Sequence, residues 1–163
     1  MIDADVYERA RHVLHACREA GFTIATAESC TGGLVAGALT AIPGSSDVVD
    51  RGFVTYSNAA KTAMLGVPEE TLARFGAVSE ETARAMAAGA LRVAGTGLAV
   101  SITGVAGPGG GSVEKPVGLV HFGVAREDGE MRHREMRFGD LPRDEIRKRS
   151  VLVALEMLEE MAG

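Results

Sequence analysis

The sequence predicts an α/β fold, a three-layer α/β/α sandwich around a mixed, mainly parallel sheet with an antiparallel edge hairpin. Three observations lead to this class. Segments with strand and helix patterns alternate over the first hundred residues, which is typical of a parallel sheet covered on both faces. A later Asp128-Gly129 pair separates two strand patterns, as in a hairpin. The length of 163 residues suits one core, so we expect residues 1–163 to form a single domain.

The chain opens with a pattern typical of an amphipathic helix. Apolar residues recur at helical spacing over residues 5–20, and Gly21 follows as a stop signal. Residues 22–27 combine β-branched and small side chains, which predicts a short strand. A second helical pattern covers residues 32–41 and ends before Pro43. The predicted order is therefore helix, strand, helix.

The next segment contains a second strand and three helices. The strand is predicted over residues 48–56, and Ser57 suits the N-cap of a short helix through Met64. Pro68 and Ser79 then open two further helices, because both residues favour helix starts. The second of these helices is rich in alanine.

The last third of the chain holds the remaining strands and a long closing helix. Residues 98–102 form a compact apolar strand, and residues 103–111 contain too many glycines for a regular element. Strands are predicted over 117–125 and 131–138, and the charges of the second suit the edge of a sheet. A helix over 143–161 completes the prediction.

Composition and charge exclude several functional classes. The formal net charge of −5 disfavours binding to a phosphate backbone, so we expect no nucleic-acid partner. No apolar run reaches the length of a membrane span, and the N-terminus lacks a secretory pattern, so we expect a cytoplasmic protein without a membrane partner. Cys17 and Cys30 form neither a disulfide framework nor a CxxC pair. We expect no metal and no cofactor.

The segment 26–33, Thr-Ala-Glu-Ser-Cys-Thr-Gly-Gly, lies where a strand should end and a helix begin. Ligands of open α/β sheets bind in this kind of crevice. Ser29 is the candidate nucleophile, and the backbone N–H groups of Thr31, Gly32 and Gly33 could bind an oxyanion or a phosphate. The pattern equally fits an N-cap serine followed by glycines that permit tight packing. Cys30 is a rival nucleophile, although a free cysteine is more often a small packed hydrophobe.

A serine hydroxyl needs a neighbouring base to become a nucleophile. The four histidines occupy contexts that suit structural or surface roles: His12, His15, His121 and His133. Lys61 is the better candidate, because a lysine in a water-poor crevice loses affinity for its proton and serine–lysine pairs are a known variant of the catalytic triad. Tyr56 could donate to a developing oxyanion or relay a proton. A solvated lysine and a buried tyrosine are the alternative interpretations.

Two further features suit anion binding. The loop from Thr103 through Gly104 and Gly107 offers backbone N–H groups without side-chain bulk, although such loops also occur as flexible lids. Arg143 stands near the start of the last helix and suits a phosphate or a carboxylate, although an ordinary surface arginine fits as well.

Taken together, five ordered segments resemble the CinA C-terminal domain family, in particular its stand-alone nicotinamide-nucleotide amidases. The segments are 26–33, 51–58 with Lys61, 76–79, 101–110 and 115–118. The resemblance extends over essentially the whole chain. It implies that Ser29 is the nucleophile and Lys61 its base, with Tyr56, Thr103 and Arg143 completing the site.

The activity that this resemblance implies is hydrolysis of nicotinamide mononucleotide to nicotinate mononucleotide and ammonia, in pyridine-nucleotide salvage. The substrate would be a small-molecule nucleotide and the assembly a homo-oligomer. The chemistry of the residues agrees, because Lys61 could take the Ser29 proton and Oγ could attack the carboxamide carbon. Two alternatives stay open, a nucleotide-binding regulatory module without turnover and an amidase for another small carboxamide.

Overall fold

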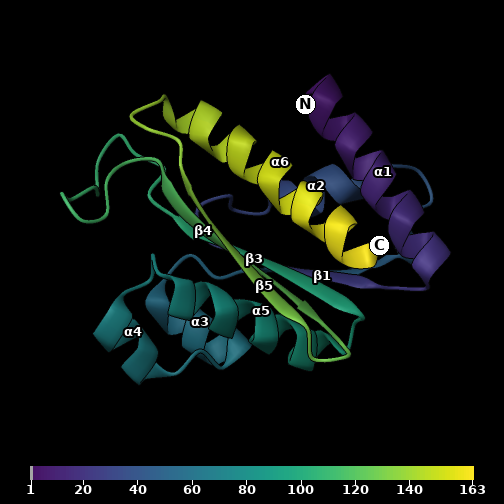
Figure 1. Ribbon diagram of the computed structural model, residues 1–163, viewed down its shortest axis with the longest axis horizontal. Coiled ribbons are helices and arrows are strands. Elements are labelled where there is room, and N and C mark those ends of the chain that lie inside the picture. The colour runs from purple at the N-terminus through teal and green to yellow at the C-terminus, as the bar shows by residue number, and fades with distance from the viewer. Residues whose placement is uncertain (1) are drawn as a thin grey trace.

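A computed structural model describes residues 2–163 as a five-stranded sheet between two layers of helices (Figure 1). The strands are β1 (Ile24–Glu28), β2 (Val49–Val54), β3 (Leu98–Gly104), β4 (Leu119–Arg126) and β5 (Met131–Arg137). The helices are α1 (Ala4–Ala20), α2 (Leu34–Thr40), α3 (Asn58–Leu65), α4 (Glu69–Phe75), α5 (Glu80–Ala94) and α6 (Arg143–Ala162), with a 3₁₀ turn at Ser45–Asp47. The predicted α/β class is confirmed.

The sheet has the strand order β2-β1-β3-β4-β5. β1 lies in the middle of the parallel part and pairs with β2 on one side and β3 on the other. β4 runs antiparallel to both β3 and β5, so the antiparallel part includes the β3–β4 pairing as well as the predicted hairpin. This direction follows from the connection, since the β3–β4 link contains no crossover helix and a parallel pair would need one.

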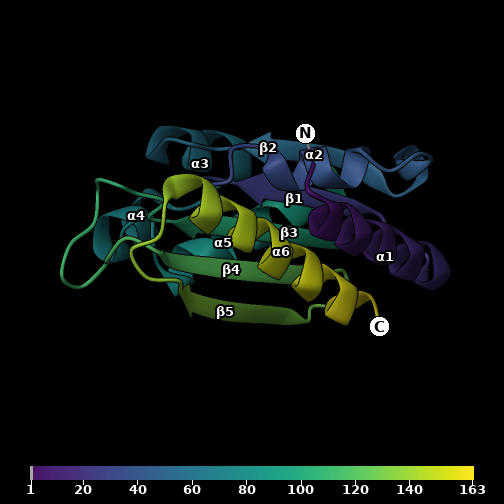
Figure 2. The same ribbon diagram turned by 90° about the horizontal axis from the view of Figure 1, so that it is seen from above.

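Helices cover both faces of the sheet, as predicted. In Figure 1, α1, α2 and α6 lie on one face of the sheet and α3, α4 and α5 on the other. Figure 2, seen from above, shows α6 lying across the strands. The first face is filled by large apolar side chains that include Leu14, Phe122 and Leu155, and the second by a smaller cluster around Leu65 and Met86. Within residues 2–163, none of the helices is long and apolar enough to cross a bilayer.

Most predicted boundaries lie within a few residues of the observed ones, and the start of α2 shows why one differs. The helix begins at Leu34 rather than at residue 32, because Gly32 and Gly33 have φ angles of +56° and +102°. These left-handed conformations are open to glycine at little cost and lie outside the helical region. The chain therefore makes a sharp turn after β1 before α2 starts. Ser57 and Ser79 cap α3 and α5 through their hydroxyl oxygens, as expected.

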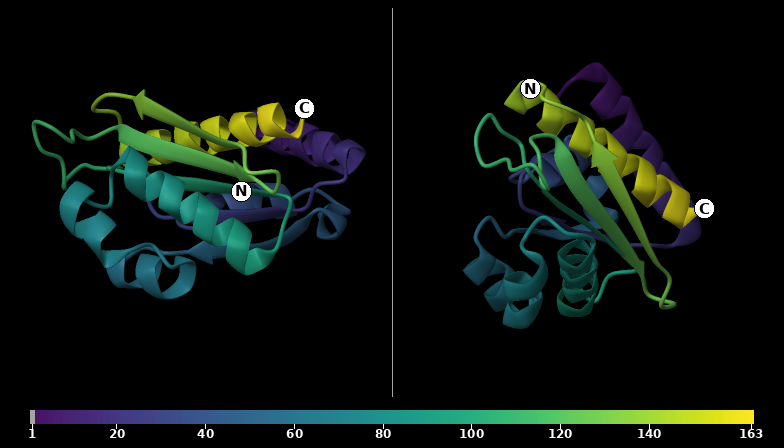
Figure 3. Two further views of the ribbon diagram at one scale, coloured as in Figure 1. Left: turned by 60° about the horizontal axis from the view of Figure 1, so that its bottom comes forward. Right: turned by 60° about the vertical axis from the view of Figure 1, so that its left-hand side comes forward.

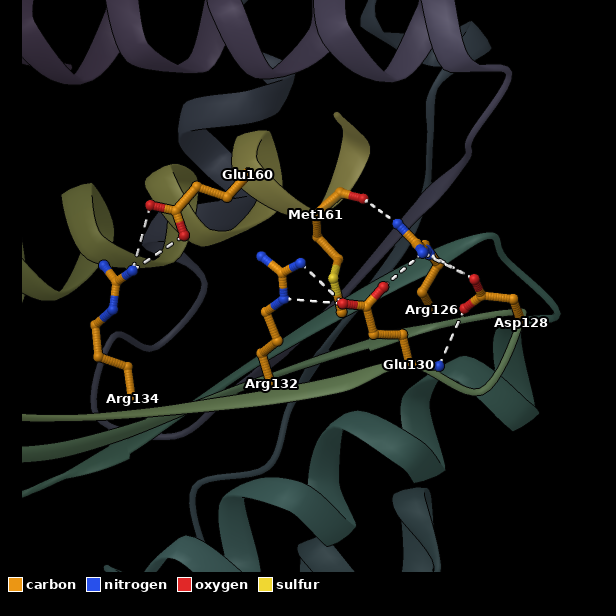
Figure 4. A network of polar contacts seen from close by, with 7 residues as sticks. All are labelled: Arg126, Asp128, Glu130, Arg132, Arg134, Glu160 and Met161. Carbon is orange, nitrogen blue, oxygen red and sulfur yellow. Dashed lines mark hydrogen bonds and ion pairs between the residues drawn. The ribbon is translucent and has the colours of Figure 1, made fainter.

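The β4–β5 hairpin is tied to the end of α6 by arginines (Figure 4). The Arg126 guanidinium donates to the Met161 carbonyl oxygen at 2.9 Å, and Arg134 donates to Glu160 at 3.0 Å. These side chains are partly exposed, so each pair contributes little to the free energy of unfolding. At the opposite end of the sheet, the loop between β3 and β4 projects beyond the strand ends (Figure 3).

Candidate active site

A cavity of about 280 Å³ opens where the parallel strands end, at the edge of the sheet that open α/β folds use for ligands. Its walls come from the turn after β1, the β2–α3 segment, the segment before α5, the glycine-rich loop and the first residue of α6. The lining residues are Ser29, Cys30, Tyr56, Lys61, Ala77, Val78, Thr103, Gly104, Val105, Ala106, Gly107, Gly109, Gly110 and Arg143.

Ser29 and Lys61 both line this cavity and contact each other. The Lys61 Nζ atom lies 3.0 Å from the Ser29 Oγ atom and donates to the Thr55 carbonyl oxygen at 2.8 Å. Ser29 is fixed at the strand end because its backbone N–H donates to the carbonyl oxygen of Ile102 in β3. Lys61 is fixed by α3, whose first turn is closed when the Ala60 N–H donates to Ser57 Oγ. Two separate elements thus place a hydroxyl and an amine within hydrogen-bond distance.

The surroundings of Lys61 favour its neutral form. Only 1% of Lys61 is exposed, and its two hydrogen-bond partners are uncharged oxygens. Burial lowers the pKa of Lys61 below its ordinary value, because the ammonium form loses hydration that these partners do not replace. A neutral amine beside a serine hydroxyl can accept the hydroxyl proton.

Cys30 also borders the cavity, but its thiol is poorly suited to react. Its residue is 5% exposed, and burial raises the pKa of the Cys30 thiol to about 12. The thiol therefore stays protonated at neutral pH, and the thiolate is the reactive form. Of these two adjacent residues, Ser29 is the one whose side chain contacts a candidate base, the Lys61 amine.

Tyr56 and Arg143 lie together at the mouth of the cavity. Arg143 donates through one nitrogen to the Tyr56 hydroxyl oxygen at 2.9 Å and through another to the Gly107 carbonyl oxygen at 2.7 Å. The Tyr56 oxygen accepts this bond, so its own hydrogen is free to donate to a ligand. Tyr56 is 61% exposed, in contrast to the buried tyrosine that was the alternative from sequence.

Thr103 and Gly104 form the wall at the end of β3. The Thr103 hydroxyl donates to the Ala77 carbonyl oxygen at 2.8 Å, which brings the segment before α5 into the cavity. A side chain at position 104 would meet the Val120 side chain and the Leu119 carbonyl oxygen within 3 Å, so glycine is required there for packing. Gly107 lines the cavity beside them.

Thr31, Gly32 and Gly33 are placed apart from the other predicted site residues. Among the residues that the structure describes, these three do not border the cavity. The Gly32 N–H donates to the Ser29 carbonyl oxygen, and the Thr31 hydroxyl donates to the Glu28 carboxylate at 2.6 Å. The anion that the start of α2 was expected to attract is therefore supplied by the chain itself, as the side chain of Glu28.

The side chains around the cavity do not suggest a metal centre. Within residues 2–163, no group of three or more histidine, cysteine or acidic side chains is arranged to hold a metal ion. The polar side chains that line the cavity supply two hydroxyls, an amine, a phenol and a guanidinium, beside the buried Cys30 thiol. This set suits acyl transfer, in which a serine attacks a carbonyl carbon and a neutral base moves the proton.

The sequence of this chain matches those of known proteins. The model of the family described as "CinA C-terminal domain" matches residues 6–162. The chain belongs to the CinA C-terminal domain family. It is 51% identical over 159 residues to the nicotinamide-nucleotide amidohydrolase PncC of Escherichia coli strain K12, a match that covers 97% of this chain and 95% of that protein.

This CinA C-terminal domain is also similar to solved structures and to parts of longer proteins. A crystal structure of the competence/damage inducible protein CihA from Agrobacterium tumefaciens has a TM-score of 0.98 and 55% identity, covering 100% of this chain and 99% of that one. A CinA-like protein of Chloroherpeton thalassium is 61% identical over 114 residues, which are 70% of this chain and 27% of that protein. The domain thus occurs both as most of a chain and within larger proteins.

Two residues whose side chains contact the turn after β1 were not found by the sequence analysis. Glu28 directly precedes Ser29 and is fully buried, and a carboxylate at the end of an otherwise uncharged strand is the signal that could have revealed it. Arg147 donates to the carbonyl oxygens of Cys30 and Thr31 at 3.1 and 3.3 Å. It stands four residues after Arg143, on the same face of α6, so helical spacing could have linked the two.

Proposed function

We propose that this chain hydrolyses the carboxamide of nicotinamide mononucleotide to nicotinate mononucleotide and ammonia, through an acyl-enzyme on Ser29. The observation that carries the proposal is the 3.0 Å contact between Ser29 Oγ and Lys61 Nζ. This amine is buried, and its hydrogen-bond partners carry no charge. The similarity to nicotinamide-nucleotide amidohydrolases over nearly the whole chain supports the choice of substrate.

Acylation begins with a proton transfer. The neutral Lys61 amine takes the Ser29 proton while Oγ forms a bond to the carboxamide carbon, and the carbonyl oxygen becomes an oxyanion. The Tyr56 hydroxyl, whose hydrogen is free, donates a hydrogen bond to this oxyanion. Lys61 then returns the proton to the amide nitrogen, the C–N bond breaks, and ammonia leaves an ester on Ser29.

Deacylation uses the same groups in the reverse order. Lys61 takes a proton from water, the hydroxide oxygen attacks the ester carbon, and the proton passes to Ser29 Oγ as the acid is released. The Thr55 carbonyl oxygen holds one N–H of Lys61 at 2.8 Å throughout, so the nitrogen lone pair stays directed at the reacting oxygen. The chain is restored without a cofactor.

The nucleotide end of the substrate has its own binding groups in this proposal. Backbone N–H groups of the glycine-rich loop, around Gly107 and Gly109, and the Arg143 guanidinium border the outer part of the cavity. Arg143 has five N–H donors and uses two nitrogens for protein contacts, so further donors are available to a phosphate. We assign phosphate binding to these groups and not to Thr31, Gly32 or Gly33.

The reaction fits a salvage step in pyridine-nucleotide metabolism in the cytoplasm, because it retains the nucleotide and alters only its ring substituent. Cys17 and Cys30 are buried and unpaired, as is common in reducing compartments. We also propose a homo-oligomer, supported by the free edge of β2, which pairs with β1 on one side only and carries the exposed Val54. Analytical ultracentrifugation tests this assembly.

The proposal is tested by ammonia release from a panel of carboxamides. We expect the purified protein to release ammonia from nicotinamide mononucleotide, more slowly from the unphosphorylated riboside, and to keep its rate in the presence of a chelator. Faster release from a different carboxamide would replace the substrate. Binding of the nucleotide without any ammonia release would favour a regulatory module, and a rate lost to chelator and restored by a divalent ion would contradict the mechanism.

A further inference from the structure

Glu28 is a buried acidic side chain that the proposed chemistry does not use. Glu28 is fully buried, and three donors converge on its two oxygens. The Thr31 hydroxyl donates to Oε1 at 2.6 Å, the Val35 N–H to Oε1 at 2.9 Å, and the Ala36 N–H to Oε2 at 3.0 Å. A buried carboxylate without such partners would cost several kcal/mol, so these three bonds make its position possible.

All three donors belong to the turn and helix that follow Ser29. The main chain of β1 is fixed up to this point, because the Thr55 N–H donates to the Glu28 carbonyl oxygen and the Ser29 N–H donates to Ile102. Beyond Ser29 the chain reverses through the two left-handed glycines. The Glu28 side chain links the two ends of this turn, because it extends from the end of β1 and accepts hydrogen bonds from the first turn of α2.

A second group holds the same turn from outside. Arg147 in α6 donates to the carbonyl oxygens of Cys30 and Thr31, and a side chain on Gly32 would lie 3.3 Å from its guanidinium. Glu28 contacts the backbone of α2, while Ser29, just beyond the end of β1, contacts Lys61 of α3.

From these contacts we infer that Glu28 is a positioning residue that fixes the turn carrying Ser29, so that Oγ stays within reach of Lys61. The inference rests on the proposed function of Ser29 as nucleophile. Glu28 does not border the cavity, so its effect should fall on the chemical step and leave nucleotide binding to the glycine-rich loop and Arg143. Small displacements of a reacting group are costly, since an error of 1 Å can lower a rate by about a hundredfold.

The test compares isosteric variants of the carboxylate and of its partner. Glu28→Gln retains the volume but turns one oxygen into an NH₂ group that faces a donor. We expect kcat to fall by about tenfold or more, with KM changed by less than about threefold. Thr31→Val removes one of the three donors and should cause a smaller fall, and Thr31→Ser should restore the rate because it restores the hydroxyl. Thr96→Val is the matched control, because it deletes a buried hydroxyl bond of 2.8 Å at the far end of β3.

A second readout does not depend on the substrate. Phenylmethylsulfonyl fluoride sulfonylates an activated serine and releases fluoride, and mass spectrometry of the peptide containing Ser29 gives the rate. We expect Glu28→Gln and Thr31→Val to slow this labelling in proportion to their loss of kcat, and Thr96→Val to label like the wild type. If the wild type labels at Ser29 but releases no ammonia, the proposed substrate fails while the role of Glu28 is still measured.

Two results would overturn the inference. The first is a folded Glu28→Gln protein whose Ser29 labelling rate equals that of the wild type. The second is a Thr96→Val protein that loses as much kcat as Thr31→Val at equal loss of thermal stability, because the effect would then be one of general stability. If Glu28→Gln does not fold, the comparison of Thr31→Val, Thr31→Ser and Thr96→Val decides the question alone.

Discussion

At the level of single residues, the reactivity of the site depends on differences in burial and hydrogen bonding between neighbours. Ser29 and Cys30 are adjacent, yet only Ser29 faces the Lys61 amine, while burial raises the pKa of the Cys30 thiol to about 12. We therefore expect Ser29→Ala to remove turnover and retain nucleotide binding, and Cys30→Ser to keep most activity. Calorimetry and ammonia release measure the two effects. If only Cys30→Ser abolished turnover, Ser29 would not be the nucleophile.

The pH dependence of the rate tests Lys61. Burial lowers the pKa of Lys61, and the active form is the deprotonated amine, so the rate should rise with pH through this lowered pKa and then level off. Lys61→Arg keeps the positive charge but cannot lose a proton near neutrality, so we expect the rate to fall by about a hundredfold or more.

The control for Lys61 is Lys148→Arg, since the Lys148 ammonium is partly exposed and pairs with Asp3 and Asp5. This variant should keep the wild-type rate and pH profile. If Lys61→Arg also kept most of the rate, Lys61 would serve only as a charge, and Tyr56 would be the next base to test.

At the level of elements, we expect the packing of α3 on α5 to affect the position of Lys61, which α3 carries. Gly89 in α5 packs directly on α3, and a Cβ atom at position 89 would lie 2.0 Å from the Leu65 carbonyl oxygen. Gly89→Ala should therefore force the helices apart, lower the free energy of unfolding by about 1–3 kcal/mol and reduce kcat. Gly37→Ala is the matched control, because a Cβ atom there meets nothing within 4 Å.

For Gly37→Ala, the helix propensity of alanine predicts a gain in stability of up to about 1 kcal/mol. Urea unfolding and ammonia release of both variants check the prediction. Equal stability and equal rates for Gly89→Ala and the wild type would show that α3 does not depend on this contact.

The elements were predictable where their signals are local. The caps at Ser57 and Ser79, the hairpin turn and the closing helix each depend on residues within a few positions of one another. The start of α2 was placed two residues early, because helical periodicity does not report that Gly32 and Gly33 adopt left-handed conformations. The antiparallel β3–β4 pairing was also harder to predict from the sequence, since the relative direction of the two strands depends on the path of a long loop.

The site was predictable in part for the same reason. Ser29, Lys61, Tyr56, Thr103, Gly104, Gly107 and Arg143 all border one cavity, and most were found through motifs or a suitable side-chain chemistry. Thr31, Gly32 and Gly33 were grouped with them by adjacency to Ser29, but Thr31 contacts Glu28, Gly32 lies beside Arg147, and Gly33 lies beside Val54. Which face a residue takes after a sharp turn depends on tertiary contacts and not on its neighbours in sequence.

For the molecule as a whole, we expect a pair of histidines to make the free energy of unfolding depend on pH. His121 Nδ1 and His133 Nε2 lie 2.9 Å apart between β4, β5 and α5, and burial lowers the pKa of both imidazoles. Glu80 and Glu135 face the pair and oppose this shift, while Arg84 and Lys115 add to it.

A lowered pKa means that the unfolded chain binds protons more readily than the folded one near pH 6. The free energy of unfolding should then rise with pH up to the unfolded pKa of about 6.5, and fall as the pH drops through the lowered values. His133→Gln should flatten this slope in urea titrations between about pH 5 and 7. His15→Gln, an exposed histidine on α1, should leave the slope unchanged. An unchanged slope in His133→Gln would exclude the pair as its source.

Hydroxylamine trapping tests the central claim, an acyl-enzyme on Ser29, most directly. Hydroxylamine attacks the ester in place of water, so nicotinamide mononucleotide should yield the hydroxamate of the nucleotide together with ammonia. We predict that the wild type forms this hydroxamate in proportion to the hydroxylamine added, and that Ser29→Ala and Lys61→Arg form almost none. Ammonia release by the wild type without any hydroxamate, or equal hydroxamate formation by Ser29→Ala, would contradict the mechanism.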